Sequence, residues 1–199
     1  MSKVKKQWGK ITQLLIYFRP NLFFKDFTKV DTHFLKMNNI RLFLCDLDNT
    51  LAPHFSKFPS QNAINFVKKI KEDGILFYVV SNNFKNRVKR FCEKLNPDGF
   101  IYNAKKPLIF KIKKLVKKLN IQPSETILMG DQFVIDVFAA NRLGCKSILV
   151  VPLTEVNSKN AGKSRLINFL DKLIYKHLSQ NNLLTSVDTK IFDLETMIL

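Results

Sequence analysis

Short apolar stretches alternate with amphipathic segments between residues 40 and 151. Five of the apolar stretches predict buried strands, at 40–45, 75–80, 99–102, 127–129 and 147–151. Between them, apolar residues recur every three or four positions, which predicts helices over 61–73, 86–95, 108–119 and 133–143. Continuous apolar strands that alternate with helices are typical of a parallel sheet covered on both faces. Because such crossovers are right-handed, we expect a doubly wound, Rossmann-type α/β domain.

The segment before this core is basic and rich in aromatic residues. Residues 1–39 carry eight Lys or Arg residues against Asp26 and Asp31. Four apolar residues of this extension fit one face of a short amphipathic helix: Ile11, Leu14, Leu15 and Phe18. Such a face either packs on its own domain or contacts a membrane surface.

A further helix is predicted over residues 164–178, after the last strand. We expect its apolar residues to face inward: Leu166, Ile167, Leu170, Leu173, Ile174 and Leu178. Residues 179–199 show no regular period, and we interpret them as a C-terminal tail. The chain is therefore expected to comprise an extension (1–39), one α/β domain (40–178) and that tail (179–199).

Length and composition are those of one globular domain. The chain has 199 residues, of which 46% are hydrophobic and 25% are charged. No apolar run reaches the roughly 18 residues of a membrane-spanning helix, and no small-residue cleavage site follows the basic N-terminus. Cys45, Cys92 and Cys145 are widely spaced, which predicts packing roles in a reducing compartment. We therefore expect a cytoplasmic protein, either free or at the membrane periphery.

The net charge of +17 has two possible explanations. Lys supplies 27 of the 33 basic residues, and Lys, Asn, Ile and Phe all have AT-rich codons, so genomic bias is one explanation. Attraction to an anionic partner, such as a phosphorylated substrate, anionic lipid or RNA, is the other. Arg, which suits bidentate phosphate and base contacts, occurs only 6 times, which disfavours a sequence-specific nucleic-acid reader.

Polar residues follow four of the predicted strands. In chain order these groups are Asp46-Leu47-Asp48-Asn49-Thr50, Ser81-Asn82-Asn83, Lys105-Lys106-Pro107, and Gly130-Asp131 with Asp136 five residues on. The carboxyl ends of parallel strands share one edge, where open α/β sheets bind ligands. Four carboxylates gathered there repel one another and require a cation, and oxygen ligands suit Mg2+.

This set of groups fits phosphoryl transfer. A Mg2+ ion and a lysine can neutralise the phosphoryl oxygens while one carboxylate attacks phosphorus and forms an aspartyl-phosphate. A second carboxylate can protonate the leaving oxygen and then activate water. Asp46 and Asp48 are two positions apart, which places both on one side of an extended segment. Helix capping is the alternative role for any one of these acids, but it does not explain all four strand ends.

These motifs resemble the four motifs of the haloacid dehalogenase (HAD) phosphatase superfamily. They are DLDNT at 46–50, the apolar strand ending in Ser81, Lys106 before Pro107, and GDQFVID at 130–136. The resemblance covers residues 40–151 and implies a HAD-like fold. It also implies that Asp46 is the nucleophile and a Mg2+ ligand, and that Asp48 is the acid/base and a ligand through its carbonyl.

The same resemblance implies roles for the remaining polar groups. Those that would bind or orient the phosphate are Thr50, Ser81, Asn82 and Lys106. Asp131 would bind Mg2+, and Asp136 would either bind it or support the ligands from behind. Lys105 competes with Lys106 for the phosphate role, although a solvated surface role suits Lys105. His54 either lines the site or is incidental.

Longer stretches resemble the YqeG-type phosphatases of HAD subclass IIIA. They are Phe18-Arg19-Pro20, DLDNTLAPH, NAKKP, GDQFVIDVFAANRLG and ILVVPLTEV. Relatives of this group include phosphatidylglycerophosphate phosphatases. The segments between Asp48 and Ser81 and between Asn83 and Lys106 are too short for a folded cap domain. An uncapped site cannot enclose a small metabolite by closing a lid, so we expect a phosphate carried on a large molecule.

The favoured hypothesis is a Mg2+-dependent phosphomonoester hydrolase that acts on a large phosphorylated substrate, such as the head group of phosphatidylglycerophosphate. Its basic N-terminus would contact the anionic membrane. One alternative is an RNA- or ribosome-associated binding protein on a HAD scaffold. Another is a small-molecule phosphatase, which the missing cap disfavours. The complete set of Asp46, Asp48, Lys106 and Asp131 favours catalysis.

Overall fold

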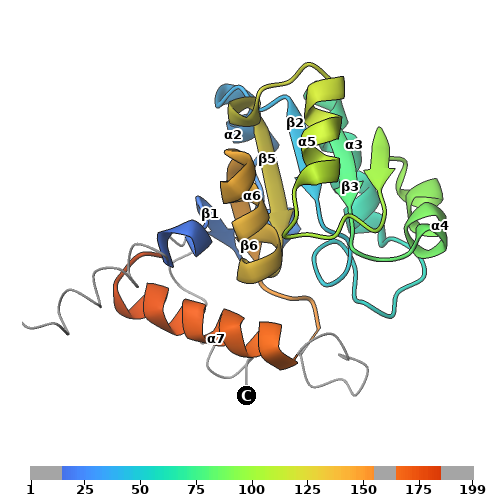
Figure 1. The fold of residues 1–199 in the computed structure, drawn as a ribbon. Coiled ribbons are helices and arrows are strands. Elements are labelled where there is room, and N and C mark those ends of the chain that lie inside the picture. Colours follow the sequence, from blue (N-terminus) through green and yellow to red (C-terminus); the bar gives the residue numbers. More distant parts are fainter. Residues whose placement is uncertain (1–14, 155–164, 185–199) are drawn as a thin grey trace, which may run out of the picture.

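Six parallel strands form one sheet in the computed structural model, which describes residues 15–154 and 165–184 (Figure 1). The strands are β1 (Leu22–Phe24), β2 (Leu42–Cys45), β3 (Leu76–Val80), β4 (Gly99–Ile101), β5 (Thr126–Gly130) and β6 (Lys146–Val150). Their order across the sheet is β1-β6-β5-β2-β3-β4, and every neighbouring pair is parallel. The predicted doubly wound α/β class is confirmed.

Helices connect the strands and cover the sheet. The α-helices are α2 (Thr32–Met37), α3 (Gln61–Glu72), α4 (Lys85–Leu95), α5 (Phe110–Lys118), α6 (Phe138–Leu143) and α7 (Arg165–Gln180). Short 3-10 turns are η1 (Ile16–Phe18), η2 (Phe27–Lys29) and η3 (Pro123–Glu125), and a π-helix, η4 (Phe133–Val137), precedes α6. The pattern predicted one continuous helix over 133–143, whereas the structure begins it with this π-helical turn, a feature often found at functional sites.

Alternate residues of the strands enter two separate cores, as the twofold period of a strand requires. Phe43 and Cys45 of β2 pack in one cluster with α3 and α4, whereas Leu42 and Leu44 pack on the other face with residues of α5 and α6. The three predicted packing cysteines are free and buried. Both faces of the sheet are therefore covered, so ligands can approach it only at an end.

The order in which strands are added to the sheet changes sides between β2 and β5. From β2 it proceeds to β3 and β4 on one side, then crosses to β5 and β6 on the other. The connections that follow β2 and β5 diverge at this switch point, which is where doubly wound sheets bind ligands. The acid-bearing loops at 46–50 and 130–136 therefore follow adjacent strands.

The sixth strand lies in the segment that the sequence analysis treats as an extension. β1 pairs with β6 in the register Leu22↔Ile148, and Asn21 Oδ1 accepts a hydrogen bond of 2.8 Å from the backbone N–H of Ser147. β1 is only three residues long, and a pattern of that length is too short to predict a strand from the sequence. Of the proposed helical face in this segment, Leu15 and Phe18 pack on a cluster of buried residues, while Ile11 and Leu14 lie outside the described residues.

Helix α7 corrects one expectation. Ile174 and Leu178 are buried as expected. Leu166, Leu170 and Leu173 were expected to face inward but are exposed. The apolar residues of α7 span two adjacent faces of the helix, and only the face of Ile174 and Leu178 packs on the domain. Within the described residues, no helix combines the length and apolarity needed to cross a membrane.

Asp171 attaches α7 to the π-helix and gives a pH-dependent prediction. Its Oδ1 accepts a 2.9 Å hydrogen bond from the backbone N–H of Val134, and burial raises the pKa of Asp171 from 3.8 to about 7. A raised pKa in the folded protein makes the ionised form destabilising, so stability falls as pH rises from about 4 to 7. We expect Asp171→Asn, which keeps an acceptor, to be more stable than the parent at pH 8, and by a smaller margin at pH 5.

Urea denaturation of both proteins at pH 5 and pH 8 measures this difference. Asp171→Ala, which removes the acceptor, is the control and should be destabilised relative to Asp171→Asn at both values. A stability difference between Asp171→Asn and the parent that does not change with pH would contradict the prediction.

Candidate active site

The site is assembled at the carboxyl ends of β2 and β5. Asp46 directly follows β2, and its backbone N–H donates a 2.8 Å hydrogen bond to the carbonyl of Met129 in β5. Asp131 directly follows β5. The hydrogen bonding of the sheet therefore continues to Asp46 and fixes its backbone beside the loop that carries Asp131 and Asp136.

A buried lysine lies between two carboxylates. Lys106 Nζ is 2.6 Å from Asp46 Oδ1 and 2.7 Å from Asp136 Oδ1, and the residue is only 3% exposed. Burial alone would lower the pKa of Lys106, but the carboxylates of Asp136 and Asp46 raise it, so the ammonium stays protonated. Lys105, the competing candidate, is exposed. Of the two lysines, the structure brings Lys106 to the acids.

The backbone of Lys106 is held by Asn82. The Asn82 side-chain N–H donates to the Lys106 carbonyl at 2.9 Å, and its Oδ1 accepts from the Lys106 backbone N–H at 2.7 Å. These two bonds clamp the loop after β4 to the loop after β3. Asn82 was expected to contact the phosphate, whereas its side chain in this structure fixes the lysine.

Thr50 and Ser81, the two hydroxyl residues predicted for the site, are buried. Thr50 Oγ1 donates to Asp131 Oδ1 at 3.3 Å. Ser81 Oγ accepts a hydrogen bond of 3.0 Å from the backbone N–H of Asn83. The first contact links the loop after β2 to the loop after β5, and the second shapes the turn that begins α4.

Asp136 lies behind the lysine, within the π-helix. Its Oδ1 accepts from Lys106, and its Oδ2 accepts a 3.2 Å hydrogen bond from the backbone N–H of Gln132. The carboxylate is 1% exposed and packs directly against Gly130, where a Cβ atom would lie 2.1 Å from Asp136 Cγ. The glycine of the GDQFVID motif therefore provides the space that the carboxylate occupies.

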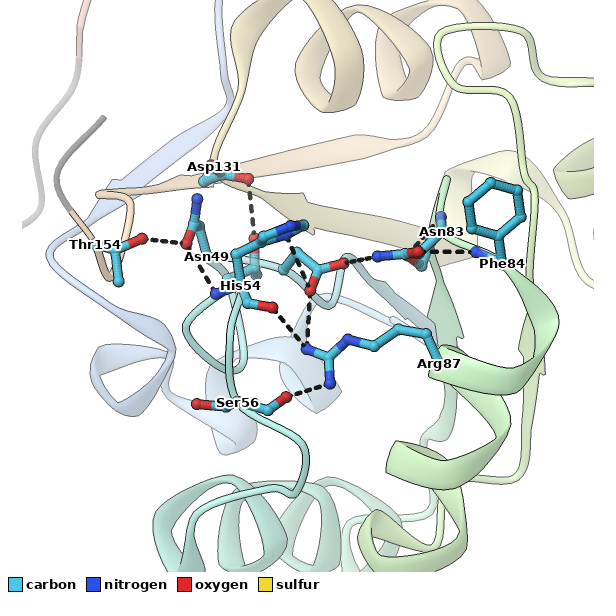
Figure 2. Close-up of polar contacts among 11 residues, drawn as sticks. Asn49, His54, Ser56, Asn83, Phe84, Arg87, Asp131 and Thr154 are labelled. Carbon is cyan, nitrogen blue, oxygen red and sulfur yellow. Dashed lines mark hydrogen bonds and ion pairs between the residues drawn. The ribbon is translucent and has the colours of Figure 1, made fainter. Parts of the chain in front are cut away.

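Asp48 has a different environment from Asp46, because it contacts three side chains of the site rim, which Figure 2 labels as Asn83, Arg87 and His54. Asn83 Nδ2 donates to Asp48 Oδ2 at 3.1 Å. An Arg87 guanidinium N–H donates to Asp48 Oδ1 at 2.9 Å, and His54 Nδ1 lies 3.6 Å from the same oxygen. His54 therefore does approach the site.

Arg87 also binds the loop that follows β2. Its guanidinium donates to the carbonyls of Ser56 and His54, so that this loop is attached to the first turn of α4 (Figure 2). Sequence reasoning missed Arg87, because nothing in a helical KNRVKR segment indicates that one side chain reaches back across the rim. The sequence does indicate Asn83 as a site residue, since it lies next to Asn82 at the end of a predicted strand.

The charges of the site indicate a shortage of positive charge. Burial raises the pKa of Asp46 from 3.8 to about 7, with Lys106 opposing and Asp136 adding to the shift. Burial, together with Asp136 and Asp46, also raises the pKa of Asp131 well above its ordinary value. One ammonium does not neutralise three close carboxylates, which is the situation that a bound cation relieves.

The oxygens of Asp46 and Asp131 and the carbonyl of Asp48 fit Mg2+ in donor type. The described residues contain no preassembled cluster of three or more His, Cys, Asp or Glu side chains that could hold a metal. Mg2+ does not require one, since it commonly takes one or two carboxylates and keeps several waters. The donor chemistry and the unneutralised charge are therefore compatible with Mg2+.

Comparison with known proteins agrees with this geometry. The model of the family "Haloacid dehalogenase-like hydrolase" matches residues 53–150. The "Probable phosphatase YqeG" of Bacillus subtilis (strain 168) is 35% identical over 137 residues, which are 69% of this chain and 79% of that protein. The chain belongs to the haloacid dehalogenase-like hydrolase family. It is a phosphatase of that family.

Two solved structures are similar to this HAD phosphatase at lower identity. An uncharacterized protein from Listeria monocytogenes serotype 4b is 18% identical, with 69% of this chain and 99% of that chain covered and a TM-score of 0.49. The 3-deoxy-D-manno-octulosonate 8-phosphate phosphatase from Moraxella catarrhalis, solved with magnesium ion, phosphate ion and a KDO molecule, is also 18% identical. That match covers 74% of this chain and 91% of that chain, with a TM-score of 0.45.

Substituting Gly130 tests the packing behind the site of this HAD phosphatase. In Gly130→Ala the new methyl group would collide with the Asp136 carboxylate. The collision would move this carboxylate away from Lys106. We expect a stability loss of about 1–3 kcal/mol, the usual cost of overpacking, together with a large loss of phosphatase activity. Thermal unfolding and phosphate release measure the two effects.

Gly99→Ala is the matched control. Its Cβ would meet the side of the Tyr78 ring, a partly exposed side chain, and Gly99 lies outside the site. This variant should keep nearly the parental activity. Equal activity losses in the two variants would show that Gly130 has no special relation to the site.

Proposed function

We propose that the protein is a Mg2+-dependent phosphomonoester hydrolase that forms an aspartyl-phosphate on Asp46. The observation that carries this proposal is the 2.6 Å contact between Asp46 and a buried Lys106 ammonium, with Asp48 two residues further along the chain. Lys106 fixes the direction of the Asp46 carboxylate and offers positive charge beside it. Mg2+, held by Asp46, Asp131 and the Asp48 carbonyl, would neutralise charge on the phosphoryl oxygens.

The reaction takes two steps that balance in atoms and protons. In the first, a carboxylate oxygen of Asp46 forms a bond to phosphorus while the bond from phosphorus to the leaving oxygen breaks. Asp48 gives its proton to that oxygen, and the alcohol departs. In the second, a water oxygen bonds to phosphorus, Asp48 takes a proton from the water, and the bond between phosphorus and Asp46 breaks to release phosphate.

The two acids occupy environments that suit these different tasks. Asp46 is 9% exposed and held by Lys106, which favours a fixed nucleophile. Asp48 lies at the rim with Asn83, Arg87 and His54 as neighbours, where a leaving group and then water can reach it. Asp136 acts in this proposal as a support, since both its oxygens accept hydrogen bonds from Lys106 and Gln132.

The substrate we propose is large, with the head group of phosphatidylglycerophosphate as the leading candidate. The connections that leave the carboxyl ends of β2, β3 and β4 are residues 46–60, 81–84 and 102–109, and all three are described in full. None contains a folded cap domain. A site without a cap accepts a phosphate at the surface of a bulky molecule and cannot seal a small one from water.

A phosphate-release panel tests the reaction and the substrate class. The full chain with Mg2+ should release phosphate from phosphatidylglycerophosphate in vesicles faster than from sugar phosphates or phosphopeptides. Asp46→Asn should lower the rate by about 10³-fold or more, because it removes the nucleophile. Release that is equal in parent and variant, or absent with all substrates, would overturn the hydrolase. Faster release from sugar phosphates would overturn only the substrate class.

Arg87→Ala tests whether Arg87 positions the proposed acid/base. A misplaced acid matters most when the leaving oxygen needs a proton, so kcat/KM for an alkyl phosphate should fall about tenfold or more. The kcat/KM for p-nitrophenyl phosphate, whose leaving group needs little protonation, should change less than about threefold. The contrast is measured in kcat/KM, which reports the first step, because kcat also contains the second step, in which Asp48 activates water for both substrates.

The control for this prediction lies on the same helix. Arg90→Ala removes an exposed cation from α4 without touching Asp48 and should leave both substrates unaffected. Arg87→Lys should restore part of the alkyl phosphate turnover, because an ammonium keeps the charge but not the two-sided guanidinium contacts. A uniform loss of kcat/KM on both substrates in Arg87→Ala would indicate a structural role alone.

A further inference from the structure

Three aromatic side chains project into solvent around the site. Phe55 and Phe58, in the loop after β2, are 76% and 56% exposed, and Phe84, at the start of α4, is 76% exposed. Large apolar side chains at this exposure forgo the favourable free energy of burial. When they gather near a functional site, they commonly mark a contact with an apolar partner.

Arg87 holds these aromatic residues on neighbouring loops beside Asp48. It donates to the Ser56 carbonyl, between Phe55 and Phe58, and it lies on the first turn of the helix that Phe84 caps. The same guanidinium contacts Asp48. Figure 2 shows Ser56 at the guanidinium of Arg87, and Phe84 at the start of the helix that carries Arg87. The exposed rings therefore border the entrance of the active site.

Within residues 41–150, the rim of the site carries lysines, and its acids are confined to the site itself. The segments that form the rim carry exposed Lys57, Lys85 and Lys105. Residues 49–71, 74–92 and 99–124 contain no Asp or Glu at all. Apart from the acids inside the site, the surface around its entrance is therefore cationic. Lysines interspersed with exposed aromatic residues are the composition of an interfacial membrane-binding surface.

The remaining acids of residues 41–150 lie toward the opposite end of the sheet, where helices end and strands begin. They are Glu72, Asp73, Glu93, Asp98 and Glu125. Two of them form ion pairs there, Lys71 with Asp98 at 3.4 Å and Arg41 with Glu125 at 3.2 Å. Codon bias enriches lysine along the whole chain, but it does not move acids to one end of a fold. The position of these five acids needs another explanation.

Helix α7 extends the apolar surface at the same end. It is attached to the π-helix after β5 through Asp171, and Figure 1 shows it beyond the end of the sheet. Its exposed apolar residues recur at helical spacing: Leu166, Phe169, Leu170 and Leu173. A helix that buries one apolar face in its domain and leaves another in water has the pattern of an interfacial helix.

We infer that the rim formed by Phe55, Phe58, Phe84 and the lysines between them docks on an anionic phospholipid bilayer. The rings would enter the boundary between head groups and acyl chains, and the lysines would contact lipid phosphates. The inference rests on the proposed function, because docking in this orientation presents a head-group phosphate to the site that opens among these residues.

Vesicle co-sedimentation of the full chain tests the docking surface. The parent should bind phosphatidylglycerol/phosphatidylcholine vesicles at least about tenfold more tightly than pure phosphatidylcholine vesicles. The triple variant Phe55→Ser/Phe58→Ser/Phe84→Ser should lose about tenfold or more of the binding to anionic vesicles. In Lys57→Glu/Lys85→Glu the loss should be about fivefold or more for each lysine.

The matched control is Phe34→Ser/Met37→Ser, which removes exposed apolar side chains of α2, the helix that precedes β2 at the opposite end. Its vesicle binding should equal that of the parent. The docking proposal is overturned if the triple variant binds as tightly as the parent, if the control loses as much binding, or if the parent binds neutral vesicles equally well.

Hydrolysis of soluble p-nitrophenyl phosphate with Mg2+ separates this proposal from the proposed function. Loss of vesicle binding in the triple variant with unchanged hydrolysis of the soluble substrate supports docking. Vesicle binding by a parent that hydrolyses no phosphomonoester supports docking and overturns the hydrolase. Hydrolysis by a parent that binds no anionic vesicle overturns docking and leaves the hydrolase intact.

Discussion

The buried ammonium of Lys106 is the interaction on which the site depends. A charged group without water is tolerated only when it is paired, and here two carboxylates supply the pairing, at 2.6 and 2.7 Å. Several local features serve this arrangement. Asn82 clamps the Lys106 backbone, and Gly130 leaves room for the Asp136 side chain. The same arrangement leaves the site with more negative than positive charge, which gives it an affinity for cations and for a proton.

Much of this arrangement could be predicted from the sequence, because strand ends and acids are both visible in it. The apolar runs located five strands, and parallel strands must bring Asp46 and Asp131 to one edge. The contacts that depend on three-dimensional approach were not visible. The reach of Arg87 across the rim, the edge strand β1 and the outward face of α7 each depend on which segments pack together. A regular spacing of apolar residues shows that a helix or strand has an apolar face, but it does not identify the segment that packs on that face.

The charge illustrates the same limit. A net charge of +17 is equally compatible with codon bias and with an anionic partner, so the total cannot decide between them. The positions of the acids add information that the total lacks, because the fold brings segments that are distant in the chain to the same end of the sheet. The acid-free segments 74–92 and 99–124 each contain a connection at the carboxyl end, and the segment 49–71 contains most of a third. The ion-paired acids Asp98 and Glu125 lie at the amino end.

Asp46 and Asp48 are two residues apart, yet they belong to different parts of the molecule. Asp46 is fixed by the interior, through Lys106 and the hydrogen bond to Met129. Asp48 is fixed by the rim, through Asn83 and Arg87. Since Arg87 also holds the loop that carries Phe55 and Phe58, a force that moves this loop acts on the acid/base before it acts on the nucleophile. Contact between the rim and a surface would therefore alter proton transfer while the interior of the site stays in place.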